Sequence, residues 1–489
     1  MNGIGTENSA VNDTNLRVVK RSELRKKPKR RLPVRLIIIL LVIIAALTAL
    51  VIFAFRGRDI DMSESNVLMN VSYELSSKAD FYTYNGNVFY STKDSMRCLD
   101  GKGREKWVDS YTMLSPVMIG DKNVAAVAEK NGTNVRVYNE DGLLYNVTFT
   151  EPVITFAVNG GGYMGAIVKK GQDYELALYN DKGDKVYGGN YVARQGIPMA
   201  IDISDDSRMF AVAFMDVSNI KLKSNVLFYY INKDDTKGVE SSNGMFSSVV
   251  SEDCMPFMLK FTPDGRCIAL MDDRAVFIDP AAADETKKRL EIPVGNHIAY
   301  ACVNGDGTVA VAFGEPLLNA AEQLEKNTVV WYDSKGARVN EFRADKDITG
   351  LYAGSDITVV AMDRSFAAYK TKGGSVWQYT ALQDTLKVLP YSGSDKMLAV
   401  TSLNAFVAKV GKGNNLIEAQ RDEAGNFVAD TEATTLEVQS AAQEETTAAA
   451  QSEQTTEAVQ GESEQTTSEE QTTTAAEQTT AAAEETTNG

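Results

Sequence analysis

The stretch Thr262-Pro-Asp-Gly-Arg-Cys-Ile-Ala269 joins a tight polar turn to the first residues of a small, apolar strand. Pro, Asp and Gly each favour a turn for a separate reason, and the strand that follows must bury one of its faces. The same unit returns at Asp306-Gly307, which precedes Val309-Ala-Val-Ala-Phe313. The fold is therefore expected to consist of repeats of this turn-and-strand unit.

Eight copies of this unit align along the body of the chain. Their central turns begin at Asn85, Asp121, Gly160, Asp206, Asp264, Asp306, Ser355 and Ser394. Successive turns are 36 to 58 residues apart, close to the roughly 40–50 residues of a four-stranded propeller blade. Small side chains in the strands suit positions that are crowded around an axis. The sequence predicts an all-β fold, a β-propeller over residues 80–429 with seven or eight blades, eight being favoured.

An apolar run near the N-terminus predicts a transmembrane helix. It extends for twenty residues from Leu36 to Phe55 with Thr48 as its only polar member, enough to cross the roughly 30 Å hydrocarbon core of a bilayer. Residues 1–35 hold ten Lys and Arg against three acids, and the positive-inside bias then keeps this basic segment cytoplasmic. We expect an uncleaved signal anchor; a cleaved signal peptide is the alternative.

The segments that flank the predicted propeller differ from it in composition. Residues 56–79 form a spacer, in which 66–73 is a possible closing strand. Residues 430–489 contain fourteen acids and no Lys or Arg, and consist mostly of Thr, Glu, Ala, Gln and Ser. Such a segment buries too little apolar area to offset its ordering entropy, so we expect a disordered tail. Its Thr pairs are compatible with O-glycosylation and equally with an unmodified acidic chain.

Two motifs carry a resemblance to known propellers. The aromatic-Asp-x-x-Gly-x-x-x-Trp shape that ends at Trp107 and Trp377 resembles the repeat of quinoprotein-like propellers. Two turns resemble the corresponding turn of WD40-like, YVTN-type propellers: residues 262–269 and Ile203-Ser-Asp-Asp-Ser-Arg-Met-Phe210. With one predicted span and a polar tail, the whole layout is similar to single-pass envelope proteins of Gram-positive bacteria. The resemblance implies the fold and no particular activity, because such propellers serve as enzymes, scaffolds and ligand sensors alike.

The sequence contains few residues that could carry chemistry. His297 is the only histidine, which removes multi-histidine metal sites and schemes built on paired imidazoles. Gly160–Gly165 matches Gly-x-Gly-x-x-Gly, but a strand and another turn follow it, so it predicts a hairpin and not a dinucleotide site. We therefore predict no catalytic, cofactor-binding or metal-binding residues. A glycosidase pair could still come from five acids: Asp202, Asp205, Asp206, Asp272 and Asp273.

Four cysteines lie on the predicted extracellular side: Cys98, Cys254, Cys267 and Cys302. Disulfides can form there without being required, and four cysteines allow three full pairings. Cys267 and Cys302 occupy apolar strands of neighbouring copies and could approach one another. We favour independent buried thiols over this pairing.

Composition and repeat together predict a non-enzymatic binding module. Residues 36–429 carry a formal net charge of −9, a mild acidity that argues against nucleic-acid binding. Binding residues tend to lie on long loops of a rigid scaffold, and the fourth and sixth copies carry insertions within 216–243 and 314–327. We expect a membrane-anchored extracellular propeller that binds a protein or glycan of the cell envelope. The alternative is an exported enzyme that acts on glycans or uses a quinone cofactor.

The insertion in the sixth copy is the predicted partner-binding segment. Pro316 stands before apolar residues at helical spacing, which predicts a short amphipathic helix on a blade loop. The residues expected to bind a partner are Leu317, Leu318, Ala321 and Leu324. Packing of this helix on its own blade is the alternative.

Overall fold

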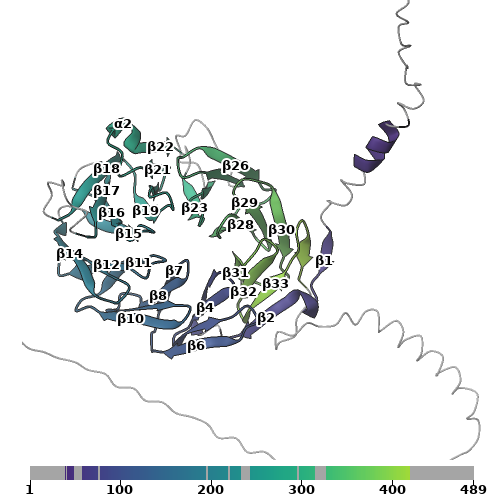
Figure 1. The fold of residues 1–489 in the computed structure, drawn as a ribbon, viewed down its shortest axis with the longest axis horizontal. Coiled ribbons are helices and arrows are strands. Elements are labelled where there is room, and N and C mark those ends of the chain that lie inside the picture. The colour runs from purple at the N-terminus through teal and green to yellow at the C-terminus, as the bar shows by residue number, and fades with distance from the viewer. Residues whose placement is uncertain are drawn as a thin grey trace, which may run out of the picture. The chain divides into compact units, whose positions relative to one another are not determined.

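The structure is a computed structural model that describes residues 39, 41–48, 58–74, 77–193, 196–218, 221–232, 243–293, 297–313 and 327–418. Within these ranges the strands form eight sheets, which stand around a central axis as the blades of a ring (Figure 1). The predicted β-propeller is confirmed. The sheets follow the eight sequence copies in order, and we number them blades 1 to 8 along the chain.

Blades 1 to 6 each consist of four consecutive antiparallel strands, with the first strand at the channel and the fourth at the rim (Figure 1). The strands of blades 1 to 3 are β3 (Asp80–Tyr84), β4 (Asn87–Ser91), β5 (Ser95–Leu99), β6 (Glu105–Ser110), β7 (Pro116–Asp121), β8 (Val124–Glu129), β9 (Asn134–Asn139), β10 (Gly142–Thr148), β11 (Val153–Val158), β12 (Met164–Lys170), β13 (Asp173–Tyr179) and β14 (Lys185–Tyr191). Those of blades 4 to 6 are β15 (Ile197–Ile203), β16 (Met209–Asp216), β17 (Lys223–Tyr230), β18 (Met245–Glu252), β19 (Pro256–Phe261), β20 (Cys267–Met271), β21 (Arg274–Ile278), β22 (Arg289–Pro293), β23 (Ile298–Val303), β24 (Val309–Phe313), β25 (Thr328–Tyr332) and β26 (Arg338–Arg343).

Both ends of the described body contribute to the last two blades. Blade 8 comprises β31 (Thr385–Pro390), β32 (Lys396–Thr401), β33 (Asn404–Lys409) and, from the N-terminal side, β2 (Val67–Ser72). Blade 7 comprises β27 (Gly350–Ala353), β28 (Ile357–Met362), β29 (Ser365–Lys370) and β30 (Ser375–Thr380), extended by β34 (Asn415–Ile417) and β1 (Asp59–Asp61). Two short helices, η1 (Glu64–Asn66) and α2 (Glu285–Lys288), lie in connections.

The strand β2 closes the ring. It pairs antiparallel with β33, so that Val67 lies opposite Ala408 and Ser72 opposite Asn404. This is the position expected for the closing strand in the predicted spacer. The strands β34 and β1 add a second closure, in which both run parallel to β30 at the rim of blade 7. The sequence did not predict this closure.

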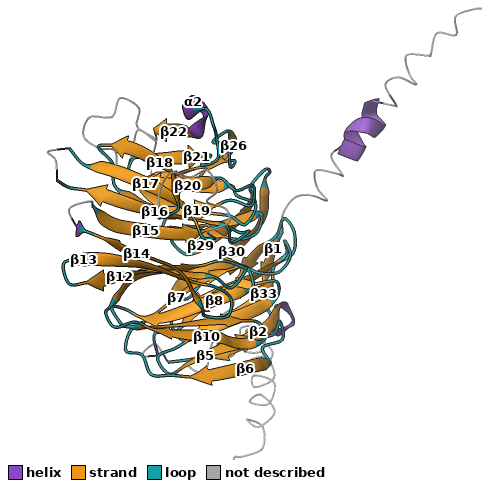
Figure 2. Cartoon of the chain, turned by 60° about the vertical axis from the view of Figure 1, so that its left-hand side comes forward, coloured by secondary structure: helices purple, strands orange, loops and turns teal. Residues whose placement is uncertain are grey.

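The second strand of each blade is sandwiched between neighbouring blades, which are seen from the side in Figure 2. Its sequence is small and apolar on both faces: VAAVAE in β8, CIALM in β20 and VAVAF in β24, all buried except Glu129. Such side chains let the sheets pack closely. The apolar clusters accordingly join adjacent blades, and one of them contains Phe228 of blade 4 together with Cys267 of blade 5.

The described residues contain no helix that is long and apolar enough to cross a membrane. Of the predicted anchor from Leu36 to Phe55, only residues 39 and 41–48 are described, and these are helical. The remainder of the anchor, the basic residues 1–35 and the tail 430–489 lie outside the described ranges. The predictions for these segments stay predictions.

The four cysteines are free and buried. The favoured prediction of independent buried thiols is therefore confirmed over the pairing of Cys267 with Cys302. Burial raises the pKa of the Cys98 and Cys254 thiols to about 11, so both stay protonated at neutral pH and behave as small apolar side chains.

Candidate functional site

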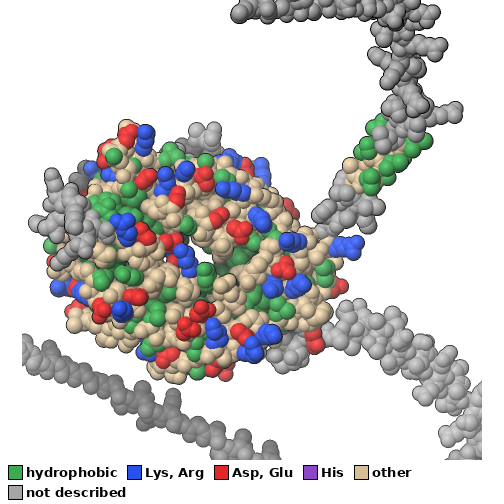
Figure 3. Space-filling model, viewed as in Figure 1, with side chains coloured by type: hydrophobic (Ala, Val, Ile, Leu, Met, Phe, Trp, Pro, Cys, Tyr) green, Lys and Arg blue, Asp and Glu red, His purple; other side chains and the backbone are tan. Residues whose placement is uncertain are grey.

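The connections between the first and second strands of the blades meet at one end of the central channel, which we call the turn mouth. Side chains from seven blades surround a cavity of about 660 Å³ there. Backbone φ angles of +79° at Gly265 and +80° at Gly307 shape two of these turns, and residues with a Cβ atom adopt such angles only with strain. Figure 3 shows the opening at the centre of the ring with charged side chains beside it.

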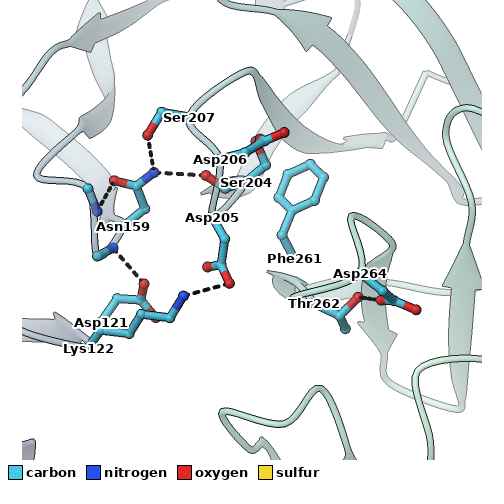
Figure 4. A network of polar contacts seen from close by, with 12 residues as sticks. Asp121, Lys122, Asn159, Ser204, Asp205, Asp206, Ser207, Phe261, Thr262 and Asp264 are labelled. Atoms are coloured by element: carbon cyan, nitrogen blue, oxygen red, sulfur yellow. Dashed lines mark hydrogen bonds and ion pairs between the residues drawn. The ribbon is translucent and has the colours of Figure 1, made fainter.

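A lysine of blade 2 reaches past blade 3 to an acid of blade 4. Lys122 directly follows β7, and its Nζ lies 2.6 Å from Oδ2 of Asp205, which follows β15 (Figure 4). Both side chains are partly exposed, at 39% for Lys122 and 24% for Asp205. Such a pair contributes about 1 kcal/mol or less to stability.

A second lysine joins blade 5 to blades 2 and 4. Lys260 lies in β19, and its Nζ is 3.1 Å from Oδ1 of Asp121 and 3.5 Å from Oδ1 of Asp202. Asp202 is only 3% exposed, and its Oδ2 accepts the N–H of Phe261 at 2.6 Å. Together the two lysines and three acids form what we call the charged network: Asp121, Lys122, Asp202, Asp205 and Lys260.

Burial decides how the innermost groups of the charged network titrate. Burial raises the pKa of Asp202 to about 6, although the ammonium group of Lys260 opposes this change. Burial alone would lower the pKa of Lys260, but Asp202 and Asp121 raise it above its usual value. Lys260 is thus charged throughout the neutral range, and Asp202 gains its proton near pH 6.

The glycine turn of blade 3 packs against the charged network (Figure 4). The N–H of Gly160 donates to Oδ2 of Asp121 at 2.8 Å. Nδ2 of Asn159 donates to the carbonyl of Ser204 and to Oγ of Ser207, both at 2.8 Å. The turn leads directly into β12 and not into a helix, so the hairpin predicted for this glycine motif is confirmed.

A buried amide joins blades 6 and 7 elsewhere at the turn mouth. Asn304 is 3% exposed; its Nδ2 donates to Oγ1 of Thr358 at 2.9 Å, and its Oδ1 accepts the N–H of Gly354 at 3.2 Å. Nε1 of Trp331 donates to the same Thr358 hydroxyl at 2.9 Å. Buried polar groups that satisfy one another in this way fix the relative position of the two blades.

Replacing Asn304 with alanine is expected to lower the free energy of unfolding by about 1–3 kcal/mol, because buried partners lose their hydrogen bonds. Denaturant unfolding of the full chain measures this loss. Asn340→Ala is the matched control: this amide bonds the carbonyls of Lys370 and Gly373 at an exposed position, and its loss should cost less than about 1 kcal/mol. Equal losses in the two variants would contradict a special role for the buried amide.

The five acids proposed for a glycosidase pair do not converge. Asp202 and Asp205 belong to the charged network, and Asp206 bonds within its own turn. Asp272 and Asp273 lie in the connection between β20 and β21, at the other end of the channel. Among the side chains that the structure describes, no group of three or more His, Cys, Asp or Glu could hold a metal ion.

Sequence reasoning recognised Asp121-Lys122 only as a turn and did not single out Lys260. A signal for the pairing was present in the repeat. Asp202 and Lys260 are each the last residue but one of a first strand, in neighbouring blades. Opposite charges at equivalent positions of adjacent repeats predict an ion pair between the first strands of neighbouring blades.

The predicted partner-binding residues lie outside the part of the chain that the structure describes: Leu317, Leu318, Ala321 and Leu324. Their insertion connects β24 to β25, the second and third strands of blade 6. The end of β24 and the start of β25 therefore lie at the channel end opposite the turn mouth. His297, just before β23, is exposed.

A comparison with family models gives one match to this architecture. The model described as "Family of unknown function (DUF5711)" matches residues 59–406, which begin with β1 and end within β33. A comparison with curated proteins finds no significant match.

Solved structures with a similar fold include three propellers. The Dos1 propeller has a TM-score of 0.48 and 11% identity, covering 74% of this chain and 98% of that one. Sqt1 of Saccharomyces cerevisiae has a TM-score of 0.45 and 9% identity, covering 70% and 98%. BamB from Moraxella catarrhalis has a TM-score of 0.41 and 10% identity, covering 69% and 98%. At these identities the likeness concerns the fold alone.

Proposed function

We propose that this chain, which belongs to the DUF5711 family, is a membrane-anchored, extracellular binding module that serves as a scaffold for a protein or glycan of the cell envelope. The proposal is for a non-catalytic role. Its two supports are the cavity at the turn mouth and the predicted anchor from Leu36 to Phe55.

The cavity at the turn mouth carries the binding part of the proposal. A cavity of about 660 Å³ falls within the range of ligand sites in proteins. Each of the three acids that line it pairs with a lysine: Asp121 with Lys260, Asp205 with Lys122 and Asp356 with Lys370. Charges that satisfy one another favour recognition by shape and hydrogen bonding over proton transfer.

The predicted anchor carries the tethering part of the proposal. Only residues 56–58 separate its end from β1, and three residues extend to about 10 Å. On this proposal the rim of blade 7 stays close to the membrane surface. Any ligand of the propeller would then belong to the layer next to the membrane.

One observation favours the alternative of an exported enzyme. A carboxyl group with a pKa near 6 is typical of a general acid, and burial gives Asp202 such a pKa. Its side chain, however, is 5% exposed and paired with Lys260. This contact supports a structural role, so we propose the binding function first.

The binding proposal is tested by crosslinking in cells followed by affinity capture of the full chain. Ser355→Trp is expected to reduce the crosslinked partner at least tenfold, because Ser355 is exposed and lines the cavity. Val108→Trp, at an exposed position of β6 on the rim, is the matched control and should leave the partner in place.

Two other results of the crosslinking experiment would change the proposal. If deletion of residues 314–326 removes the partner and Ser355→Trp does not, the insertion binds it and the cavity proposal is wrong. A partner that is absent with every form, wild type included, shifts the proposal to the enzymatic alternative. Resistance of the full chain to carbonate extraction tests the anchor independently of any partner.

A further inference from the structure

Large apolar side chains surround the channel end that lies opposite the turn mouth, where the first strands begin. They come from blades 2, 3, 5, 6 and 8, and we call them the apolar ring: Val117, Ile154, Phe257, Tyr300 and Leu386. Three further exposed apolar residues stand in connections at the same end: Leu114, Met255 and Leu382. A ring of apolar side chains around one opening is typical of an interaction surface.

Backbone irregularities place three members of the apolar ring in solvent. In β11, Val153 pairs with Val168 and Thr155 with Ile167, which leaves Ile154 unpaired between them. The register shifts in the same way around Phe257 and around Leu386. A bulge turns its extra residue out of the regular alternation of the strand. The exposed fractions are accordingly 45% for Ile154, 41% for Phe257 and 56% for Leu386.

The described chain ends beside this surface. The N–H of Glu418 donates to the carbonyl of Thr380 at 2.8 Å. Its Oε2 accepts the N–H groups of Leu382 at 3.0 Å and Gln383 at 3.3 Å. Glu418 is 1% exposed, so the chain is fixed in the connection between β30 and β31. That connection leads directly to Leu386 of the apolar ring.

The sequence after Glu418 contains one apolar pair within reach of the ring. Residues 419–426 are polar or small, and Phe427-Val428 follows them. Nine residues extend to about 30 Å, whereas the four strand spacings from β34 to the channel wall amount to about 19 Å. Phe427 is also the last aromatic residue of the chain. We propose that Phe427 and Val428 bind the apolar ring of the same chain.

Hydroxyl-radical footprinting of the full chain in lipid nanodiscs tests this proposal without detergent that could occupy the ring. In the double variant Phe427→Ser/Val428→Ser, the oxidation rates of Met255, Phe257 and Leu386 are expected to rise at least threefold. Leu143 and Leu290 are exposed at the turn-mouth end of their strands, and their rates should not change. Val459→Ser, farther along the tail, is the matched control variant. Equal rates at the ring residues in all three proteins would overturn the proposal.

A crosslinker in the otherwise unchanged chain removes the dependence on a variant that could misfold. A photoreactive phenylalanine analogue at position 427 is expected to crosslink within one chain to peptides that contain Phe257 or Leu386. Crosslinks to a second copy of the chain would show a different occupant and overturn the proposal. This test does not depend on the proposed envelope partner, because it uses the purified chain alone.

Discussion

Deleting residues 58–72 is expected to abolish the cooperative unfolding transition of the propeller. The deletion removes β1 and β2, and β2 supplies the fourth strand of blade 8. It also removes Met69, which is 3% exposed and packs in the cluster that joins blade 8 to blade 1. Loss of a buried methionine side chain alone lowers the free energy of unfolding by about 2–5 kcal/mol. Each backbone hydrogen bond that β2 makes adds about 1 kcal/mol to this loss. This sum is comparable with the whole stability of a typical domain, about 5–15 kcal/mol.

Circular dichroism during denaturant and thermal unfolding of the full-length and deleted chains measures this effect. Deletion of residues 430–489 is the matched control, because no strand of blades 1 to 8 comes from that segment. The single substitution Met69→Ala should cause an intermediate loss of about 2–5 kcal/mol. A chain without residues 58–72 that still unfolds in one sharp transition would show that seven intact blades hold the ring closed without β2.

The fold could be predicted from the sequence because its signals are local. Turns rich in Asp, Asn and Gly set the backbone angles within a few residues, and small apolar strands after them mark the blades. Even the closing strand β2 is long enough to be recognised. The strands β1 and β34 could not be found, because Asp59–Asp61 and Asn415–Ile417 are too short to show any periodicity.

The candidate site was harder to predict because its contacts are distant in the sequence. Lys260 and Asp121 lie 139 positions apart, and only the curvature of the ring brings them together. The apolar ring was missed for a different reason. In β11 the residues VITFAV read as one apolar strand with Thr155 as its only polar member, and the sequence does not show that a bulge exposes Ile154.

Replacing Lys260 with methionine is expected to destabilise the propeller by about 3–5 kcal/mol at pH 7.5, since it leaves the buried charge of Asp202 without its ammonium partner. Methionine preserves most of the side-chain volume, so the loss reports on charge. This penalty should decrease as the pH falls. Burial already holds the pKa of Asp202 at about 6, above the value of about 3.9 expected in the unfolded chain. The folded state therefore binds the additional proton as the pH falls from 7 to 4, and acidification stabilises it through this group.

In the Lys260→Met variant the pKa of Asp202 should rise further, because the cation that opposed the effect of burial is gone. Most of the lost stability should consequently return at pH 5, where Asp202 is protonated and neutral. Denaturant unfolding at pH 7.5 and pH 5 measures the difference, and the double variant Lys260→Met/Asp202→Asn should recover stability at pH 7.5 without acid. Lys122→Met is the matched control: its partly exposed pair with Asp205 should cost about 1 kcal/mol or less. A loss for Lys260→Met that is the same at both pH values would show that packing, and not the buried charge of Asp202, makes Lys260 necessary.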